Sequence, residues 1–472
     1  MAIKMFPTMA AVGLSTLAGM VLTTPATAGG TYFDVTTRFV AEDGYGGGGF
    51  DMEYYGTYNG VRGWAVATTS CNMGNKVAPW SQGTGTQPVI AQNCYRLHEG
   101  RFEQIGMSWL KHSCCAVSEP GCNSPFGGCQ STGCSTLGIG CADTYWAGLN
   151  ADADAPRCDI NAFTGQYDYP FSISPSGPSA VRGKLQLVDE DYLDYPGALY
   201  FVEGQYVEPG ESVEGDELRQ NNNASHRQVK FNSATSATGN GAYETQHEVP
   251  ALWAWQDLAG ANVLSLPTLE QQLDGDWDGE GRVNVGWLVT DNGDGTWHYE
   301  YAVNNQNSHR CIDEFSVPVP SGTTLTNVEF KDVHYHSGEE NVIYGTDWTF
   351  QHVNGAATWT AVEEGYWDED QSGDPVWVAT TNAIRWATMY NFRFDADAPP
   401  VMATITMPYW RAGPETAIQF DGQGPDAAGC PGDLNGDNVV NVDDILVAIS
   451  GFGDEYNVED ILEVLAYFGT GC

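Results

Sequence analysis

Basic residues are scarce in this chain. Its 472 residues include 61 Asp and Glu but only 19 Lys and Arg, which gives a formal net charge of −42 at pH 7. Nucleic acids and anionic membranes both attract proteins through a basic face. The composition therefore excludes both as electrostatic partners, and it favours solubility and the binding of divalent cations.

Long apolar runs are missing beyond the N-terminus. A bilayer span needs about 18 or more consecutive apolar residues, so we expect no membrane span after processing. Residues 1–28 predict a secretory signal peptide, with Lys4 as the positive start, an apolar stretch over 9–22 and a small-residue cleavage box at 26–28. The mature protein is thus expected to be secreted, either extracellular or at the cell surface.

Local catalytic motifs are also missing from the predicted mature chain, which has no G-x-S-x-G elbow, no HExxH and no P-loop. Glycoside hydrolysis, however, needs only two carboxylates about 5 to 9.5 Å apart. With 61 acidic residues, the sequence neither excludes that chemistry nor names the pair.

The 12 cysteines are unevenly distributed. Nine lie from Cys71 to Cys158, one is Cys311, and Cys430 and Cys472 bracket the last segment. In an exported chain they predict disulfides, and the group between residues 114 and 141 lacks the CxxC pairs of zinc sites. If Cys430 pairs with Cys472, full pairing requires Cys311 to bond into the N-terminal group. The alternative is one free thiol in each region.

Alternating apolar residues predict a mainly β body. Residues 283–289 alternate, and residues 297–303 alternate again after an Asp- and Gly-rich turn, which indicates a β-hairpin. Turn signals about every ten residues favour a β-sandwich over residues 198–408. Residues 29–197 predict a Cys- and Gly-rich β domain held by disulfides, and residues 409–429 predict a linker.

His334 and His336 are candidate metal ligands. On the predicted strand 328–336, alternate residues point to the same side, so both imidazoles and Asp332 share a face. Two histidines with a carboxylate suit zinc, copper or iron, which would make the chain a metal-dependent oxidoreductase. The alternative is a polar edge strand whose histidines are solvated or bonded to loops.

Two acidic turns and two aromatic pairs are weaker candidates. Residues 274–279 and 368–374 each contain the front half of a calcium loop, and each predicts either an acidic turn or a structural calcium site. Next to the second turn lie Tyr366-Trp367 and Pro375-Val376-Trp377. If exposed, their rings can stack on sugars; the alternative is that they pack in the core or in loops.

The sharpest motif lies near the C-terminus. Calcium takes six to eight oxygen ligands, which a looped helix supplies at positions 1, 3, 5, 7, 9 and 12. Counted from Asp433, this pattern predicts a calcium site with the following ligands: Asp433, Asn435, Asp437, the carbonyl of Val439, Asn441 and Asp444. The alternative is a turn that caps a helix and binds nothing.

A helical sequence follows the loop and occurs twice, at 441–453 and 457–469. Asn441 predicts an N-cap. The apolar stripe of the first copy, which we expect to pack on the second helix, consists of Ile445, Leu446 and Ile449. So small a module needs cross-links. Calcium is one, and a Cys430–Cys472 disulfide would be the second; alternatively, Cys472 is a covalent attachment point.

The loop and the duplicated helix resemble a dockerin, and the flanking cysteines with the terminal Gly471-Cys472 are similar to the GC-type dockerins of planctomycete-like secreted proteins. The resemblance covers residues 430–472. It implies calcium-dependent attachment to a cohesin-like domain or a cell-surface component. The second copy has lost most of its loop, so we expect one calcium ion.

These observations predict a disulfide-rich N-terminal region, a β-sandwich and a small two-helix calcium-binding module. The favoured function is that of a secreted protein attached through its tail, whose body is a non-catalytic binding or structural β domain with polysaccharide among its candidate partners. The body loosely resembles uncharacterised extracellular β modules of bacterial surface proteins. The alternative is a secreted polysaccharide-degrading enzyme that hydrolyses O-glycosyl bonds, because dockerins often accompany glycoside hydrolases.

Overall fold

The computed structural model describes most of the chain. The described ranges are 31–42, 51–213, 219–271, 278–336, 343–369, 375–426, 434–435, 439–453 and 456–469. The predicted signal peptide, Cys430 and Cys472 lie outside them. Strands take 45% of the residues and helices 10%, which confirms the mainly β fold. Within these ranges, no helix is long and apolar enough to cross a bilayer.

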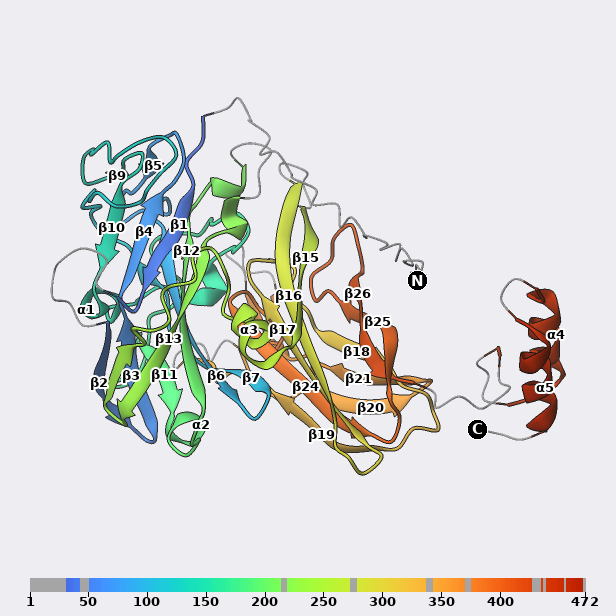
Figure 1. The fold of residues 1–472 in the computed structure, drawn as a ribbon. Helices are drawn as coiled ribbons and strands as arrows, with labels where there is room; N and C mark the ends of the chain where they lie inside the picture. The colour runs from blue at the N-terminus through green and yellow to red at the C-terminus, as the bar shows by residue number, and fades with distance from the viewer. Residues whose placement is uncertain are drawn as a thin grey trace, which may run out of the picture.

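The N-terminal unit contains two main sheets (Figure 1). The larger has nine strands, in the order β14 (Ser236–Gly239), β13 (Ala224–Ser233), β12 (Leu199–Val207), β6 (Val89–His98), β7 (Arg101–Met107), β11 (Leu185–Val188), β3 (Val61–Val66) and β2 (Met52–Tyr58), with β8 (Lys111–His112) beside β6. The smaller consists of β1 (Val35–Val40), β4 (Thr68–Asn72) and β10 (Ala142–Tyr145). Strand β1 packs on β12, and their apolar faces share a core that includes Val40 and Val202.

Short elements complete this unit and its edge. A two-stranded sheet pairs β5 (Ala78–Pro79) with β9 (Thr136–Leu137). The short helices are α1 (Ala147–Asn150), α2 (Asp189–Tyr192) and α3 (Trp253–Ala259). Helix α3 ends at Gly260, whose φ of 76° is the left-handed conformation that glycine adopts without strain.

The C-terminal unit is a β-sandwich. One sheet has the order β15 (Asn262–Gln271), β16 (Asp278–Asp291), β17 (Trp297–Asn305), β24 (Thr388–Ala396) and β19 (Leu325–Lys331). The other has the order β20 (Thr349–Val353), β21 (Ala356–Thr360), β18 (Glu314–Pro318), β25 (Pro400–Pro408) and β26 (Ala417–Pro425). Aromatic rings join the two sheets: Phe315 of β18 stacks on Phe392 of β24 with centroids 4.4 Å apart.

The predicted hairpin is confirmed as β16 and β17. Trp287 lies opposite Tyr301, and Val285 opposite Val303, so residues of one parity face the sandwich core. At the turn, Gly293 has a φ of 78° and donates its N–H to Asp291 over 2.7 Å. Alternation and turn chemistry are both local, which is why the sequence is sufficient to place this element.

The unit boundaries differ from those expected from the sequence. Strands β12, β13 and β14 follow residue 197 but belong to the N-terminal sheet, where β12 pairs with β6 over its whole length. The segment 409–429, expected to be a linker, contains β26, which pairs with β25 from Pro408 to Pro400. Pairing with strands far along the chain decides the structure of both segments.

Two helices form the C-terminal tail. Helices α4 (Val442–Ser450) and α5 (Val458–Ala466) pack side by side and lie apart from the sheets in Figure 1. Asn441 is the N-cap of α4, as the sequence predicts, and accepts the N–H of Asp443 over 2.7 Å. The Asp444 carboxylate in turn accepts the N–H of Asn441 over 2.8 Å, which completes a capping box.

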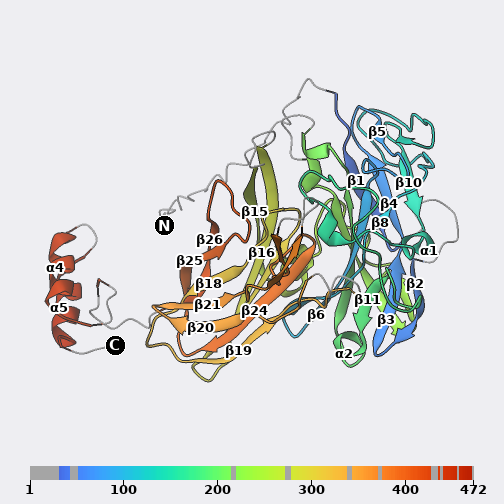
Figure 2. The same cartoon turned by 180° about the vertical axis from the view of Figure 1, so that it is seen from behind.

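The two β units meet at a buried junction. Figure 2 shows the two β units side by side from behind, and β7 packs on β24. Across the junction, Asn391 donates its side-chain N–H to the carbonyl of Phe102 over 2.9 Å, and Gln104 accepts the N–H of Met389 over 2.7 Å. Hydrogen bonds to backbone groups fix the relative position of the two units, since buried backbone groups need partners.

An ion network lies within this junction. Arg393 of β24 is 2.6 Å from Glu103 of β7, 2.8 Å from Glu300 of β17 and 3.2 Å from Glu329 of β19. The Arg393 side chain is 4% exposed, and those of Glu103 and Glu300 are 6% and 2%. Burial alone would raise the pKa of Glu103, but the charges of Arg393 and Arg96 outweigh it and leave that pKa below its ordinary value.

Replacing Arg393→Met should destabilise the protein by roughly 3–5 kcal/mol, because Glu103 and Glu300 would lose a buried counter-charge. The measurement is the free energy of unfolding in urea at pH 7. Arg101→Met is the matched control. Arg101 is 40% exposed and lies 3.8 Å from Glu300 at the rim of the same network, so its loss should cost under about 1 kcal/mol.

Lowering the pH should reduce the difference in unfolding free energy between the wild type and Arg393→Met. Because the folded pKa of Glu103 is lowered, its stabilising contribution is complete above the unfolded value of about 4.3 and is lost as the pH falls through the lower folded pKa. Equal losses for Arg393→Met and Arg101→Met at pH 7 would contradict a dominant buried network.

Candidate functional site

The tail brings part of the predicted calcium loop together. Asp433 and Asp437 lie outside the described residues, whereas Asn435, Val439, Asn441 and Asp444 lie within them. Asp444 is fully buried. One of its carboxylate oxygens accepts the N–H groups of Leu434 and Asn435, over 2.8 and 3.0 Å. Position 12 of the loop is thus held against positions 2 and 3.

The apolar surface of the tail differs from the expectation. Of the stripe expected to pack on α5, Leu446 and Ile449 are exposed and Ile445 is half-buried, whereas Ala448 and Val464 are fully buried. The exposed residues recur at equivalent places in the two helical copies, and each is between 50% and 58% exposed: Val442, Leu446, Ile449, Phe452, Val458, Leu462, Leu465 and Phe468. These eight large apolar side chains therefore form the outer surface of the tail.

The structure does not place His334 and His336 on a common face. Strand β19 ends at Lys331, so the segment that follows is not held in a ladder. His334 is exposed, whereas His336 is buried with its ring 5.8 Å from that of Trp109. Asp332 accepts a bond from Asn382 over 2.7 Å. In the described part of the chain, no three His, Cys, Asp or Glu side chains are grouped to hold a metal.

The aromatic residues near the acidic turn form an exposed hairpin. Strands β22 (Gly365–Glu369) and β23 (Pro375–Ala379) pair with Trp367 opposite Trp377. Trp367 is 70% exposed and Trp377 is 42% exposed, and their ring centroids are 5.4 Å apart. Neither ring is in the sandwich core, so the core-packing alternative is wrong for this pair. The acidic-turn residues 272–277 and 370–374 lie outside the described ranges.

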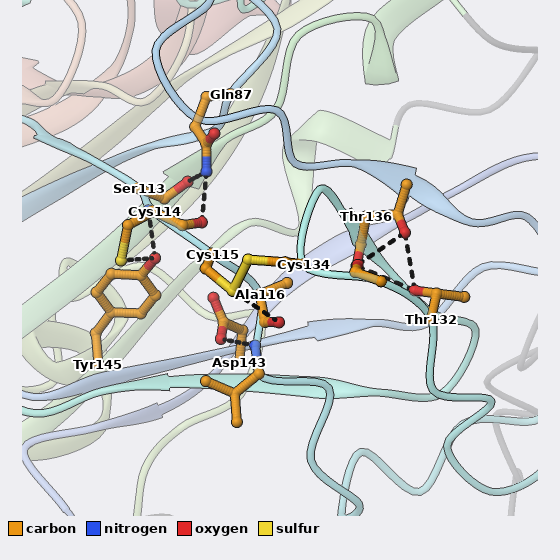
Figure 3. The surroundings of a disulfide bond; sticks show 12 residues. Gln87, Ser113, Cys114, Cys115, Ala116, Thr132, Cys134, Thr136, Asp143 and Tyr145 are labelled. Atoms are coloured by element: carbon orange, nitrogen blue, oxygen red, sulfur yellow. Dashed lines mark hydrogen bonds between the residues drawn. A yellow bond between two sulfur atoms is a disulfide. The ribbon is translucent and has the colours of Figure 1, made fainter.

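Disulfides account for six of the N-terminal cysteines, which confirms the preference for disulfides in this region. The pairs are Cys71–Cys122, Cys115–Cys134 and Cys129–Cys141. Figure 3 shows that Tyr145 lies beside the Cys115–Cys134 bridge and donates its O–H to the sulfur of Cys114 over 3.3 Å. Burial raises the pKa of the neighbouring Asp143 to about 7.

Four described cysteines lie outside these disulfides: Cys94, Cys114, Cys158 and Cys311. Cys158 of the N-terminal unit and Cys311 of the C-terminal unit line one cavity of about 20 Å³ at the junction. Cys311 has a φ of 56° and accepts an N–H from Arg411 over 3.0 Å. Cys158 is therefore the N-terminal cysteine that shares a cavity with Cys311.

A second, larger cleft also lies at the junction. It has a volume of about 300 Å³ and is lined largely by charged residues, among them Arg96, Arg101 and Lys331. Arg96 stacks on Tyr195 at 3.5 Å, and Lys331 pairs with Asp191 over 3.2 Å. Most of these charges have partners, so the cleft is the edge of the ion network rather than a site with unused groups.

Sequence reasoning missed the basic residues of the smaller cavity. Arg385, Arg411 and His309 lie in three separate segments, which bridges between Ile312, Ile384 and Tyr409 bring side by side. The usable signal was that two arginines each adjoin a tryptophan, in a chain poor in basic residues.

Comparisons with known proteins add little. No protein-family model matches the chain, and no curated protein matches it. A solved structure of an exo-beta-D-glucosaminidase is similar at a TM-score of 0.13 and 8% identity, over 80% of this chain and 26% of that one. The alignment spans about a quarter of the enzyme, and a score this low carries no conclusion about fold or function.

We expect oxidised protein to contain a Cys158–Cys311 cross-link. Two thiols would give one disulfide, and the two electrons and two protons would pass to an oxidant such as oxidised glutathione. The measurement is peptide mapping by mass spectrometry, without reduction, after thiols are blocked under denaturing conditions. A linked peptide joining residues 158 and 311 is the expected result.

The Cys311→Ser variant is the control, and in it Cys158 should be recovered in blocked form. Recovery of both cysteines in blocked form from the oxidised wild type would contradict the expectation, as would a link from Cys311 to Cys94 or Cys114.

Proposed function

We propose that this chain is an exported protein that attaches to a partner protein through a calcium-ordered tail, while its β body presents a surface for glycan. The observation on which this rests is the double row of exposed apolar side chains on α4 and α5. Contiguous exposed apolar surface marks interaction sites. The disulfides support export, since they persist in oxidising compartments.

Calcium fits the described part of the loop. Asn435, the carbonyl of Val439, Asn441 and Asp444 all offer oxygen atoms, which calcium prefers. The Asp444 carboxylate accepts N–H groups from Leu434 and Asn435 at the start of the loop and from Asn441 beside the helix. Asp444 lies against the start of the loop, where a closing ligand has to be. The expected occupant of the apolar rows is a cohesin-like domain.

Trp367 and Trp377 support glycan binding by the body. Tryptophan offers a large apolar face at low conformational cost and is enriched among residues that dominate binding energy. The apolar C–H faces of a sugar match such rings. Because the pair lies on a two-stranded hairpin outside the main sheets, stacking would not disturb the core.

The tail should form a calcium-dependent complex with a cohesin-like domain. We expect the full chain to co-elute with that domain in calcium during gel filtration and to separate from it in a chelator. The double variant Leu446→Glu with Leu462→Glu should lose the complex, because it places charge on both apolar rows. Met402→Glu, which changes a 67% exposed residue of β25, should keep it.

Calcium ordering is tested separately on two adjacent aspartates. Hydrogen exchange in α4 should slow on addition of calcium in the wild type and in Asp443→Ala, whose side chain is exposed, but not in Asp444→Ala. Loss of the Asp444 cap should also cost about 1–2 kcal/mol of local stability. The same exchange rates with calcium and with chelator in the wild type would contradict the calcium site.

Trp367→Ala with Trp377→Ala should abolish retention of the protein on polysaccharide. The measurement is affinity electrophoresis of the full chain through gels containing one of several polysaccharides, and we expect the dissociation constant to rise at least about tenfold. Trp146→Ala, at an exposed tryptophan of the N-terminal unit, is the matched control and should bind normally.

Reducing-end release is assayed on the same polysaccharides. Retention without release is expected of a binding protein. Release by the wild type would instead favour the polysaccharide-degrading alternative, and unchanged retention of the double tryptophan variant would remove this hairpin as the binding surface.

A further inference from the structure

The small junction cavity collects positive charge in an otherwise acidic protein. It is lined by Arg157 and Cys158 from one unit and by His309, Arg385 and Arg411 from the other. None of its described lining residues is Asp or Glu. Because acidic residues outnumber basic ones by 61 to 19, a cavity with three arginines and no acid is opposite in charge to the protein as a whole.

Arg385 and Arg411 both pack on Trp410. Their guanidinium groups lie 4.4 and 4.6 Å from the ring of Trp410. Arg385 donates to the carbonyl of Thr381 over 3.0 Å, and Arg411 donates to the carbonyl of His309. Carbonyls, an aromatic ring and, for Arg411, the sulfur of Cys311 at 3.0 Å position these groups, and none of these partners is a carboxylate.

The counter-charge that such a pair needs is missing among the described residues. Neither Arg385 nor Arg411 has a carboxylate within ion-pair distance there, whereas Arg393 has three. The Nε of Arg385 is buried, and in the described part of the chain it has no hydrogen-bond partner. A buried charged donor without an acceptor is costly, so an acceptor at this place would be stabilising.

His309 does not balance the charge of the two arginines, and it adds no positive charge of its own. Burial, and then the charges of Arg411 and Arg385, lower the pKa of its imidazole to about 3. The ring is therefore neutral at pH 7, because burial and both nearby guanidinium groups disfavour its protonation. The positive charge of the cavity at neutral pH thus comes from arginine alone.

We propose that this cavity binds a small anion of about the size of chloride, held by Arg385 and Arg411 at the junction of the two units. The cavity volume of about 20 Å³ has room for one or two water-sized groups. A polyanion is disfavoured because the net charge of −42 repels it. The anion would stabilise the junction, since lining residues come from both units.

The test is thermal unfolding of the full oxidised chain in sodium gluconate, with gluconate replaced stepwise by chloride at constant ionic strength. A ligand that binds only the folded state raises the unfolding temperature saturably. We expect this response in the wild type and in Arg282→Gln, the control, whose guanidinium pairs with Glu280 at the surface. In Arg385→Gln the chloride concentration for half the response should rise at least about tenfold.

A second variant keeps the test valid if Arg385→Gln fails to fold. Arg411→Lys keeps the charge but loses the planar fork, so it should respond more weakly to chloride while keeping the wild-type near-ultraviolet circular dichroism spectrum. An equal chloride response in the wild type and Arg385→Gln, or no saturable response in the wild type, would overturn the proposal. An Arg385-dependent response to sulfate instead of chloride would contradict the proposal that the cavity takes an anion of the size of chloride.

Discussion

The junction between the two β units depends on one buried arginine. Arg393 meets Glu103 of the N-terminal unit and Glu300 of the sandwich, and all three side chains are nearly sealed from water. Charges removed from water are tolerated only when they are paired with good geometry. The network therefore restricts how the sandwich can dock on the neighbouring sheet, and the hydrogen bonds of Gln104 and Asn391 extend the same docked arrangement.

The same junction also contains two arginines that no described acid neutralises. A short distance along the chain from Arg393, Arg385 shares a cavity with Arg411, and no described acid faces them. One arginine is thus neutralised by the protein itself, while the other two are positioned by carbonyls and Trp410. Positioning without neutralisation is what distinguishes a binding site from a structural ion pair, because a bound anion can then complete the charge balance.

Sequence reasoning succeeded where structure is local and failed where it is not. The β16–β17 hairpin and the N-cap Asn441 follow from period and turn or cap chemistry within a few residues. Strand β26 and the burial of His336 depend on partners far along the chain, which no local pattern reveals. The arginine cavity is harder still to predict from the sequence, because its lining forms only when three separate segments come together. The exposure of Trp367 follows from its hairpin lying outside both sandwich sheets, which alternation alone does not indicate.

The shared junction has a consequence for how this gene can be rearranged. A recombination event near the codons for residue 250 would part Glu103 from Arg393 and give two fragments, each with a large surface made for the other. A crossover just after the codon for residue 426 would instead transfer α4 and α5 with their exposed apolar rows and leave both sheets of the sandwich complete. The tail is therefore the part that can be exchanged between genes as a cassette, whereas the β body is inherited as a whole.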